Sequence, residues 1–397
     1  MINLAAPVNP VLLSAVPLKS PSSVAQSMFW EATDQLWYVC QRYVTEGDQA
    51  RLLVNRLHAD GTLLDSMVLL RAGHGANIGV DRRDDGIYLW TDALVSESLW
   101  AQAIARVRYV PDGVADASDP QSVALHQPRT GVYRVSATVD PVARELIFRS
   151  QNSNVSSATS VALVDRYDLD AAAEGVFEPL GTVSQVSTRT LQGYTSLGGY
   201  LYTLYGDSAQ ANTYITCTDW RSGKVVREQH ITTLSSLSDR EPEGLCVYQA
   251  APGDTASATL AFGFADGVPG GRTYYAARFP HPGTPAWVKV PYDTAVYVPN
   301  SDNYPPQYRL SGDQVHLHFG ISRVDGLPWT NGEVLFRLPV PARPDRTQRL
   351  VGVVSGAGVT TDTMAVRFEV TTSGDVIIYD ERPLTGWVGG DHSFWRC

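Results

Sequence analysis

The sequence predicts an all-β protein with one large unit, a five-bladed β-propeller, followed by a smaller domain. Three observations support this. At 397 residues the chain is too long for one ordinary core. Its 33 Gly, 24 Pro, 19 Tyr and 9 Trp favour short strands joined by turns. Five segments repeat one pattern, and no long helical period interrupts them.

The repeated pattern is an apolar strand, a polar turn, and a second strand rich in aromatic or branched residues. It occupies residues 26–41, 75–92, 131–150, 191–207 and 243–264. The second strands recur at intervals of 51, 59, 53 and 61 residues, measured between Tyr38, Leu89, Phe148, Leu201 and Phe262. This period accommodates a four-stranded blade, and five such units indicate a propeller.

Further strands are expected between the paired ones. Residues 50–70 alternate on both sides of a turn at Asp60-Gly61, and residues 212–231 have the same plan around Ser222-Gly223. Five units closing into a ring would bury the strand edges that an open sheet exposes. We therefore expect the propeller over residues 25–284 and a second domain over residues 285–397.

Charge and cysteine spacing exclude several classes of protein. The net charge of −10 provides no general attraction to phosphates, so we expect no nucleic acid partner and no membrane insertion. The four cysteines contain no Cys-x-x-Cys pair, which indicates neither a zinc nor a redox motif and favours folding in a reducing cytosol. Residues 1–24 lack the basic region of a signal peptide, and we expect an N-terminal arm or attachment segment.

Two groups of residues are candidates for chemistry. His74, between Gly73 and Gly75, has no nucleophile or metal-ligand partner nearby in sequence, which favours a structural position. The acidic residues at 239–243, Asp239, Glu241 and Glu243, have the composition of a paired-carboxylate site of a glycosidase. The sequence favours a charged loop fixed by Pro242 and Gly244, and leaves a glycan-processing hydrolase or lyase as the alternative.

The propeller motifs resemble a known family. "RAGHGANIGVDRRDDGIYLWTD" (71–92), "LQGYTSLGGYLYTLYGD" (191–207) and "REPEGLCVY" (240–248) are similar to the β-propeller shared by phage receptor-binding proteins and teichoic acid biosynthesis protein C-like proteins. The Gly-His-Gly-x-x-Ile-Gly run at residues 73–79, before a Tyr-x-Trp strand, is the most specific piece. The resemblance covers about residues 25–280 and implies a five-bladed propeller in a phage tail.

The C-terminal segment is similar to the trimeric head domain that ends many phage tail fibres. The resemblance implies an antiparallel β-sandwich head that trimerises and binds the host surface. The matching pieces, in order, are Gln307 to Asp313, Leu338-Pro339 with Arg343-Pro344, Gly374 to Val376, and Trp387 with Ser393-Phe394.

Together these resemblances imply a receptor-binding protein of the tail fibre or baseplate of a phage or phage-tail-like particle. We expect a homotrimer, assembled in the bacterial host cytoplasm, that contacts other tail or baseplate proteins and attaches to a host cell-wall or capsular glycan without chemistry. Aromatic side chains that stack on sugar rings are the expected contacts. The candidates are Tyr304, Tyr308, Trp329, Trp387 and Trp395.

His316 and His318 in "QVHLHFG" are candidate metal ligands. In a strand they share one face, and three copies around a threefold axis would supply six nitrogens for a transition metal. The alternative is that the strand presents two polar side chains to solvent or to a neighbouring subunit. We expect no other cofactor.

Overall fold

We describe the fold from a computed structural model. The described residues are 2–4, 9–44, 50–95, 100–153, 161–185, 189–207, 212–255, 257–280, 287–300, 304–311, 314–355 and 363–395. The chain forms two compact units, Met1–Pro282 and Gly283–Cys397, which divide close to the expected boundary. Each unit is described by itself.

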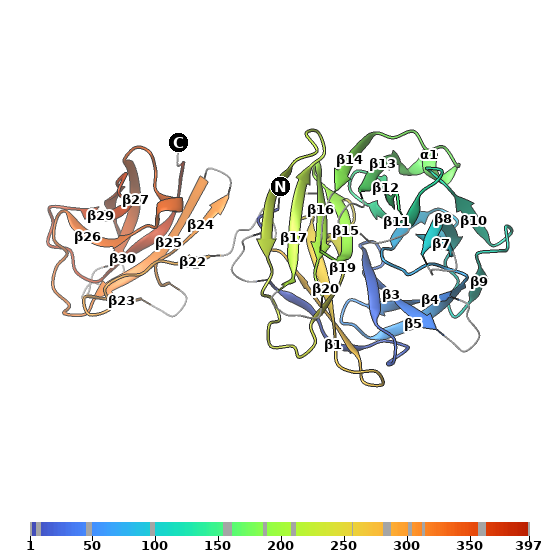
Figure 1. The fold of residues 1–397 in the computed structure, drawn as a ribbon. Helices are drawn as coiled ribbons and strands as arrows, with labels where there is room; N and C mark the ends of the chain where they lie inside the picture. Colours follow the sequence, from blue (N-terminus) through green and yellow to red (C-terminus); the bar gives the residue numbers. More distant parts are fainter. Residues whose placement is uncertain are drawn as a thin grey trace. The chain divides into compact units, whose positions relative to one another are not determined.

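The first unit is a five-bladed β-propeller, which confirms the expected fold (Figure 1). The first blade contains β2 (Ala25–Glu31), β3 (Leu36–Val44), β4 (Ala50–His58), β5 (Leu63–Leu70) and β9 (Val114–Asp116). The second contains β6 (Gly79–Arg83), β7 (Gly86–Val95), β8 (Ala101–Arg108) and β10 (Val123–His126). The third contains β11 (Tyr133–Asp140), β12 (Glu145–Gln151), β13 (Ala162–Asp168) and β14 (Gly181–Gln185).

The fourth blade contains β15 (Leu191–Leu197), β16 (Tyr200–Tyr205), β17 (Tyr214–Asp219) and β18 (Val225–His230). The fifth contains β19 (Glu241–Tyr248), β20 (Thr259–Asp266), β21 (Thr273–Arg278) and β1 (Val11–Pro17). Each residue that marked a repeat in the sequence lies in the second strand of its blade and is at most 1% exposed. The repeat in the sequence therefore corresponds to the repeat of the blades.

Strand β1 closes the ring, which corrects the expectation of an arm outside the propeller; a role of residues 1–24 as an attachment segment stays a prediction. Strand β1 pairs with β21 from Val11 opposite Ala277 to Pro17 opposite Thr273 (Figure 1). Leu13 and Val16 of "VLLSAVP" are buried in the core, and register shifts in this strand place them three residues apart. The first and last segments of the propeller therefore share one sheet, which holds the ring closed by hydrogen bonds.

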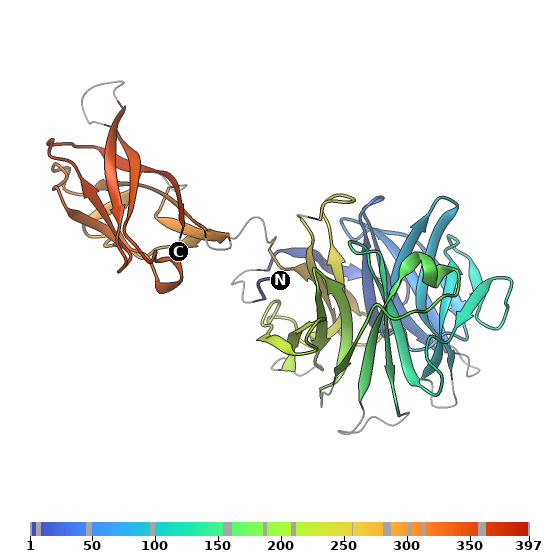
Figure 2. The ribbon, with the colours of Figure 1, turned by 90° about the horizontal axis from the view of Figure 1, so that it is seen from above.

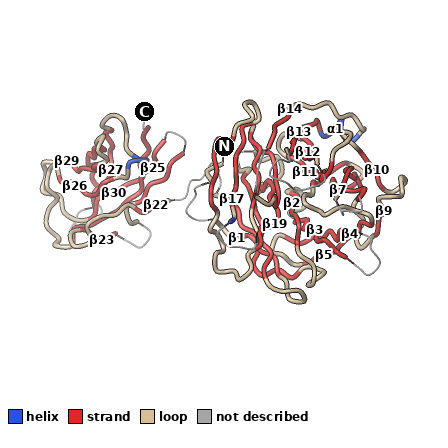
Figure 3. The backbone as a smooth tube through the Cα atoms, viewed as in Figure 1, coloured by secondary structure: helices blue, strands red, loops and turns tan. Residues whose placement is uncertain are grey.

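Helices are short in the described part of the chain, as expected (Figure 3). Helix α1 (Leu169–Ala173) connects β13 to β14, and a single 3₁₀ turn, η2 (Val340–Ala342), lies in the second unit. Among the described residues, no helix has the length and apolar character needed to span a membrane.

The innermost strands of neighbouring blades approach each other at backbone distance. A Cβ placed on Gly79 in β6 would lie 2.8 Å from the Val139 nitrogen in β11. A Cβ on Gly244 in β19 would lie 2.7 Å from the Met28 nitrogen in β2. Gly244 also has φ of +99°, a conformation that side chains disfavour. Glycine therefore permits the innermost strands of neighbouring blades, seen along the propeller in Figure 2, to pack this closely.

The second unit is a curled antiparallel sheet, in agreement with the expected β-sandwich. Its strands are β22 (Val288–Lys289), β23 (Tyr297–Pro299), β24 (Gln307–Ser311), β25 (Gln314–Arg323), β26 (Glu333–Arg337), β27 (Gln348–Ser355), β28 (Thr363–Val370), β29 (Asp375–Tyr379) and β30 (Trp387–Trp395). The two halves enclose one core, in which Phe319 contacts Phe336 and Phe368 edge to face at centroid distances of 5.1 and 5.2 Å.

Candidate functional site

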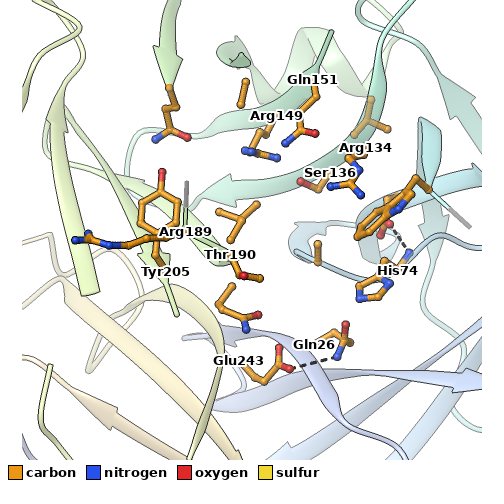
Figure 4. Close-up of a pocket in the computed structure, with 18 of the residues that line it drawn as sticks. Gln26, His74, Arg134, Ser136, Arg149, Gln151, Arg189, Thr190, Tyr205 and Glu243 are labelled. Atoms are coloured by element: carbon orange, nitrogen blue, oxygen red, sulfur yellow. Dashed lines mark hydrogen bonds between the residues drawn. The ribbon is translucent and has the colours of Figure 1, made fainter. Parts of the chain in front are cut away.

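A cavity of about 460 Å³ opens at one end of the central channel of the propeller (Figure 4). Its walls come from the first residues of β2, β11, β15 and β19 and from the loop that precedes β6. A smaller cavity of about 240 Å³ lies at the opposite ends of β2, β6 and β11. Arginine, carboxyl, amide and aromatic side chains all line the larger cavity, so we treat it as the candidate site.

β-Bulges direct side chains into this cavity. Register shifts occur between Ala25 and Ser27 in β2 and between Leu191 and Gly193 in β15. Two more occur in β11, between Tyr133 and Ser136, and in β19, between Pro242 and Leu245. A bulge leaves a residue without a ladder partner and turns its side chain. The side chains of the bulged segments that line the cavity are Gln26, Arg134, Val135, Gln192 and Glu243.

The glycine-flanked histidine lines the cavity. Asp92 holds its loop, because the Asp92 carboxylate accepts backbone N–H groups from His74 at 2.6 Å and from Gly75 at 2.9 Å. The His74 ring stacks on Trp100 at 4.9 Å, and the Arg134 guanidinium lies 4.0 Å from the centre of the same indole. The loop therefore has the structural role that the sequence indicated, and the His74 ring also faces the cavity.

Burial shifts the pKa values of His74 and Asp92 in this wall, and nearby arginines add to the shift of His74. Burial, with repulsion from Arg42 and Arg134, lowers the pKa of His74 to about 4, so the ring is neutral at pH 7. Burial raises the pKa of Asp92 to about 6, although backbone N–H groups of the loop oppose the shift. His74 therefore offers a neutral imidazole to a ligand.

The acidic residues 241–243 do not form the expected loop. Glu241 and Glu243 belong to strand β19, and both line the cavity. Pro242 and Gly244, which indicated a turn in the sequence, flank a β-bulge instead. Burial raises the pKa of Glu241, and it raises the pKa of fully enclosed Glu243 further with help from the Glu241 charge. Glu243 accepts a hydrogen bond from Gln26 Nε2 at 3.3 Å.

Cationic side chains occupy the other side of the cavity, across from Gln26 and Glu243 (Figure 4). Arg134 and Arg149 come from neighbouring strands of the third blade, whereas Arg189 precedes the fourth blade and pairs with Glu228 at 2.6 Å. Sequence reasoning missed these arginines. The available signal was a charged residue that directly follows three apolar residues within one strand, as in "ELIFRSQ".

The residues predicted for receptor contact lie in the second unit with different exposures. Tyr304 is 43% exposed and stacks on His318 at 4.7 Å. Tyr308 and Trp329 are 8% and 5% exposed and belong to the core, and Trp387 is half-buried. The side chain of Trp395 lies outside the described residues. Among the four members whose side chains are described, Tyr304 is thus the exposed one.

The predicted metal ligands share one face of β25, as expected from strand alternation. His316 Nδ1 lies 2.7 Å from Ser393 Oγ, and His318 is hydrogen-bonded to Asp391. Within the described ranges, no group of three or more His, Cys, Asp or Glu side chains is placed to hold a metal ion. Metal binding across a threefold axis stays a prediction.

Comparison with known proteins places the propeller in a family. Residues 24–275 match the family described as the phage five-bladed β-propeller receptor-binding platform domain. A protein of Bacillus subtilis (strain 168), whose name assigns it to teichoic acid biosynthesis as protein C, is 28% identical over 228 residues, or 55% of this chain. The match spans 50% of that relative.

The solved structure of a phage tail fibre supports the same fold. The tail fibre of Staphylococcus aureus phage P68 aligns with a TM-score of 0.56 and 14% identity over 96% of each chain. An exo-β-1,3-galactanase from Phanerochaete chrysosporium aligns with a TM-score of 0.41 and 9% identity over 97% of this chain and 99% of the other. This TM-score is too low to bear on activity. The family match covers more than half of the sequence, and the chain therefore belongs to the family of phage five-bladed β-propeller receptor-binding platform domains.

Proposed function

We propose that this chain is a non-enzymatic receptor-binding protein of a phage tail or tail-like particle, and that the propeller cavity holds part of a host-surface glycan. The observation that carries the proposal is the cavity itself. Its volume of about 460 Å³ lies within the usual range for ligand pockets, roughly 300–1,000 Å³. Trp100 and Tyr205 supply aromatic surface, and amides, arginines and carboxyls supply hydrogen-bonding groups.

The composition of the cavity suits a sugar better than an apolar ligand. Sugars present hydroxyl groups around their edges and C–H groups on their faces, so they need both hydrogen-bonding partners and an aromatic surface. Gln26, Gln151, Gln185 and Gln192 line the cavity from four different strands or their ends. Amide side chains both donate and accept hydrogen bonds, which matches the hydroxyl group.

We propose in addition that the second unit forms a trimer, with Tyr304 as a further contact to the receptor and with His316 and His318 near the threefold axis. Three linked cavities would convert weak individual contacts into firm attachment, because the second and third sites bind at high effective concentration. Light scattering of the full chain at micromolar concentration tests this proposal: a trimer mass supports it, and a monomer mass rejects it.

The function is tested by binding to an array of bacterial envelope polysaccharides. The full chain should retain at least one polymer, and Gln192→Trp, which fills the cavity mouth, should weaken retention by at least tenfold. Val324→Trp, at a site in the second unit that is 57% exposed, is the matched control and should bind as the wild type does. Equal binding by Gln192→Trp would remove the cavity from the proposal.

One observation favours a second candidate, a glycan hydrolase. Glu241 and Glu243 line the same cavity, and a carboxyl group with a raised pKa is the usual general acid in glycoside hydrolysis. Size-exclusion chromatography of the bound polymer separates the two candidates. A receptor-binding protein returns the polymer at its original length, whereas a hydrolase shortens it, and Glu243→Gln would abolish the shortening.

A further inference from the structure

We infer that Arg134 and Arg149 form an anion subsite in the propeller cavity, which takes a phosphodiester or carboxylate group carried by a polyhydroxylated chain. This inference rests on the proposed function and names the class of glycan that the cavity fits. The anionic group is the shared chemistry of the two possible sources, an alditol phosphate polymer and a uronic acid polymer.

Arg149 is a buried arginine in the wall of the cavity. It lies in β12 opposite Ser136 and is 8% exposed, yet it lines the cavity. Its Nε is buried without a hydrogen-bond partner, and no carboxylate in the described part of the chain forms an ion pair with its guanidinium. A buried charge without an opposite charge is costly, and proteins normally pair it or bind a ligand there.

Arg134 is the second arginine of the proposed subsite. It lies in the bulge of β11 at a φ of +51°, in the left-handed region that non-glycine residues rarely adopt. Its Nε also lacks a hydrogen-bond partner within the described residues, and its guanidinium rests on the Trp100 ring. Strained backbone of this kind concentrates at ligand sites, where it directs a side chain. The bulge and the indole together hold the guanidinium in the cavity.

Several other arginines of the propeller are paired with carboxylates, and Arg134 and Arg149 differ from them. Arg129 binds Asp165 through two nitrogens at 2.5 and 2.8 Å, and Arg83 binds Asp81 at 2.6 Å. The whole chain carries a net charge of −10, so carboxylates are plentiful. The bidentate geometry of a guanidinium matches phosphate and carboxylate oxygens, so an anionic group of a ligand is a suitable partner for Arg134 and Arg149.

Two unsatisfied acceptors indicate what surrounds the anion. Gln151 Oε1 and Gln185 Oε1 are buried in the cavity wall and accept no hydrogen bond from the described residues. The Gln185 amide is fixed, because its Nε2 donates to Thr203 Oγ1 at 2.8 Å. Hydroxyl groups of a sugar or alditol would donate to these oxygens. The facing carboxyl of Glu243 has a raised pKa and is not a competing partner for the arginines.

The test measures binding of three probes to the full-length protein by isothermal titration calorimetry. The probes are a glycerol phosphate oligomer, an oligogalacturonate and an uncharged dextran oligomer of similar length. We expect one of the two anionic probes to bind, with affinity that falls as salt rises, and dextran to bind at least tenfold more weakly. The anionic probe that binds identifies the source of the charge.

Variants then locate the subsite. Arg149→Met and Arg134→Met should each weaken the anionic probe at least tenfold, and Arg149→Lys should retain part of the affinity. Arg349→Gln, an exposed arginine of the second unit with a side chain 77% exposed, is the control and should bind as the wild type does. Because Arg149 has no carboxylate partner to lose, Arg149→Met should melt at or above the wild-type temperature.

The outcomes separate this inference from the proposed function. If the chain binds envelope polysaccharides but binds dextran as tightly as the anionic probes, the anion subsite is overturned and the receptor-binding proposal stands. The same conclusion follows if Arg149→Met binds the anionic probe as tightly as the wild type does. A marked fall in the melting temperature of Arg149→Met shows that the arginine is structural and likewise overturns the subsite. A full chain that binds no envelope polysaccharide overturns both proposals.

Discussion

Replacing Gly244 with alanine should strongly destabilise the propeller. Gly244 has φ of +99°, and holding alanine in a disfavoured backbone region costs on the order of 1–3 kcal/mol. The new Cβ would also lie 2.7 Å from the Met28 nitrogen and 3.1 Å from the Ser27 carbonyl carbon, both backbone atoms of the next blade. Such overpacking costs about 1–3 kcal/mol, which brings the expected total to about 2–6 kcal/mol.

Gly253→Ala is the matched control, because it isolates the backbone term. Gly253 has φ of +70° and lies in the turn between β19 and β20 of the same blade, where a Cβ would meet nothing within 4 Å. Gly253→Ala should therefore lower the free energy of unfolding only by the cost of the disfavoured backbone conformation. The difference between the two variants, about 1–3 kcal/mol, then reports how closely β19 and β2 pack at the channel.

Differential scanning calorimetry of the full chain measures both variants. A change of 1 kcal/mol shifts the melting temperature of a domain of this size by roughly 2–4 °C, so Gly244→Ala should melt several degrees below Gly253→Ala. Because the chain has two units, the propeller transition is compared between variants without assuming two-state unfolding. Equal melting temperatures would refute the close approach of the two strands.

Three further predictions concern protonation and ring closure. Burial raises the pKa of Glu243 above its ordinary 4.5, so the unfolded chain ionises first and the contribution of Glu243 to stability falls as pH rises above 4.5. The stability difference between the wild type and Glu243→Gln should therefore shift against the wild type as pH rises, and parallel pH–stability curves would contradict this. The pKa of His74 falls from 6.5 to about 4, so the unfolded chain is protonated first and the contribution of His74 falls as pH drops from 6.5 to 4. Over that range the wild type should lose stability relative to His74→Asn. Leu13→Asp, which places a charge at a position 1% exposed, should cost about 2–4 kcal/mol and lower the propeller melting temperature by about 4–16 °C, whereas the exposed control Val11→Asp should not.

The sequence predicts the blades well because their second strands are covered on both faces by neighbouring blades. Tyr38, Phe148 and Phe262 are all fully buried, and each stands in a run of apolar residues that recurs with the period of the blade. Strand β1 was not predicted as part of the propeller. Its partner β21 lies more than 250 residues away, and no local pattern specifies so distant a pairing.

The cavity is harder to predict from the sequence than the blades. Alternation tells which face of a strand a residue occupies, but in a blade both faces are covered, so Arg149 cannot be assigned to the cavity from its position in "ELIFRSQ". Glu243 was assigned to a loop because Pro242 and Gly244 are typical of turns, whereas here they accompany a β-bulge. The register that turns both side chains inward depends on tertiary packing.

The central claim is that the receptor site lies in the propeller cavity. A crystal structure of the full chain with the repeating unit of a polymer that it binds tests this claim most directly. We predict electron density for the ligand between Arg149 and Glu243, with its anionic group beside Arg134 and Arg149. An empty cavity with the ligand stacked on Tyr304 in the second unit would contradict the claim.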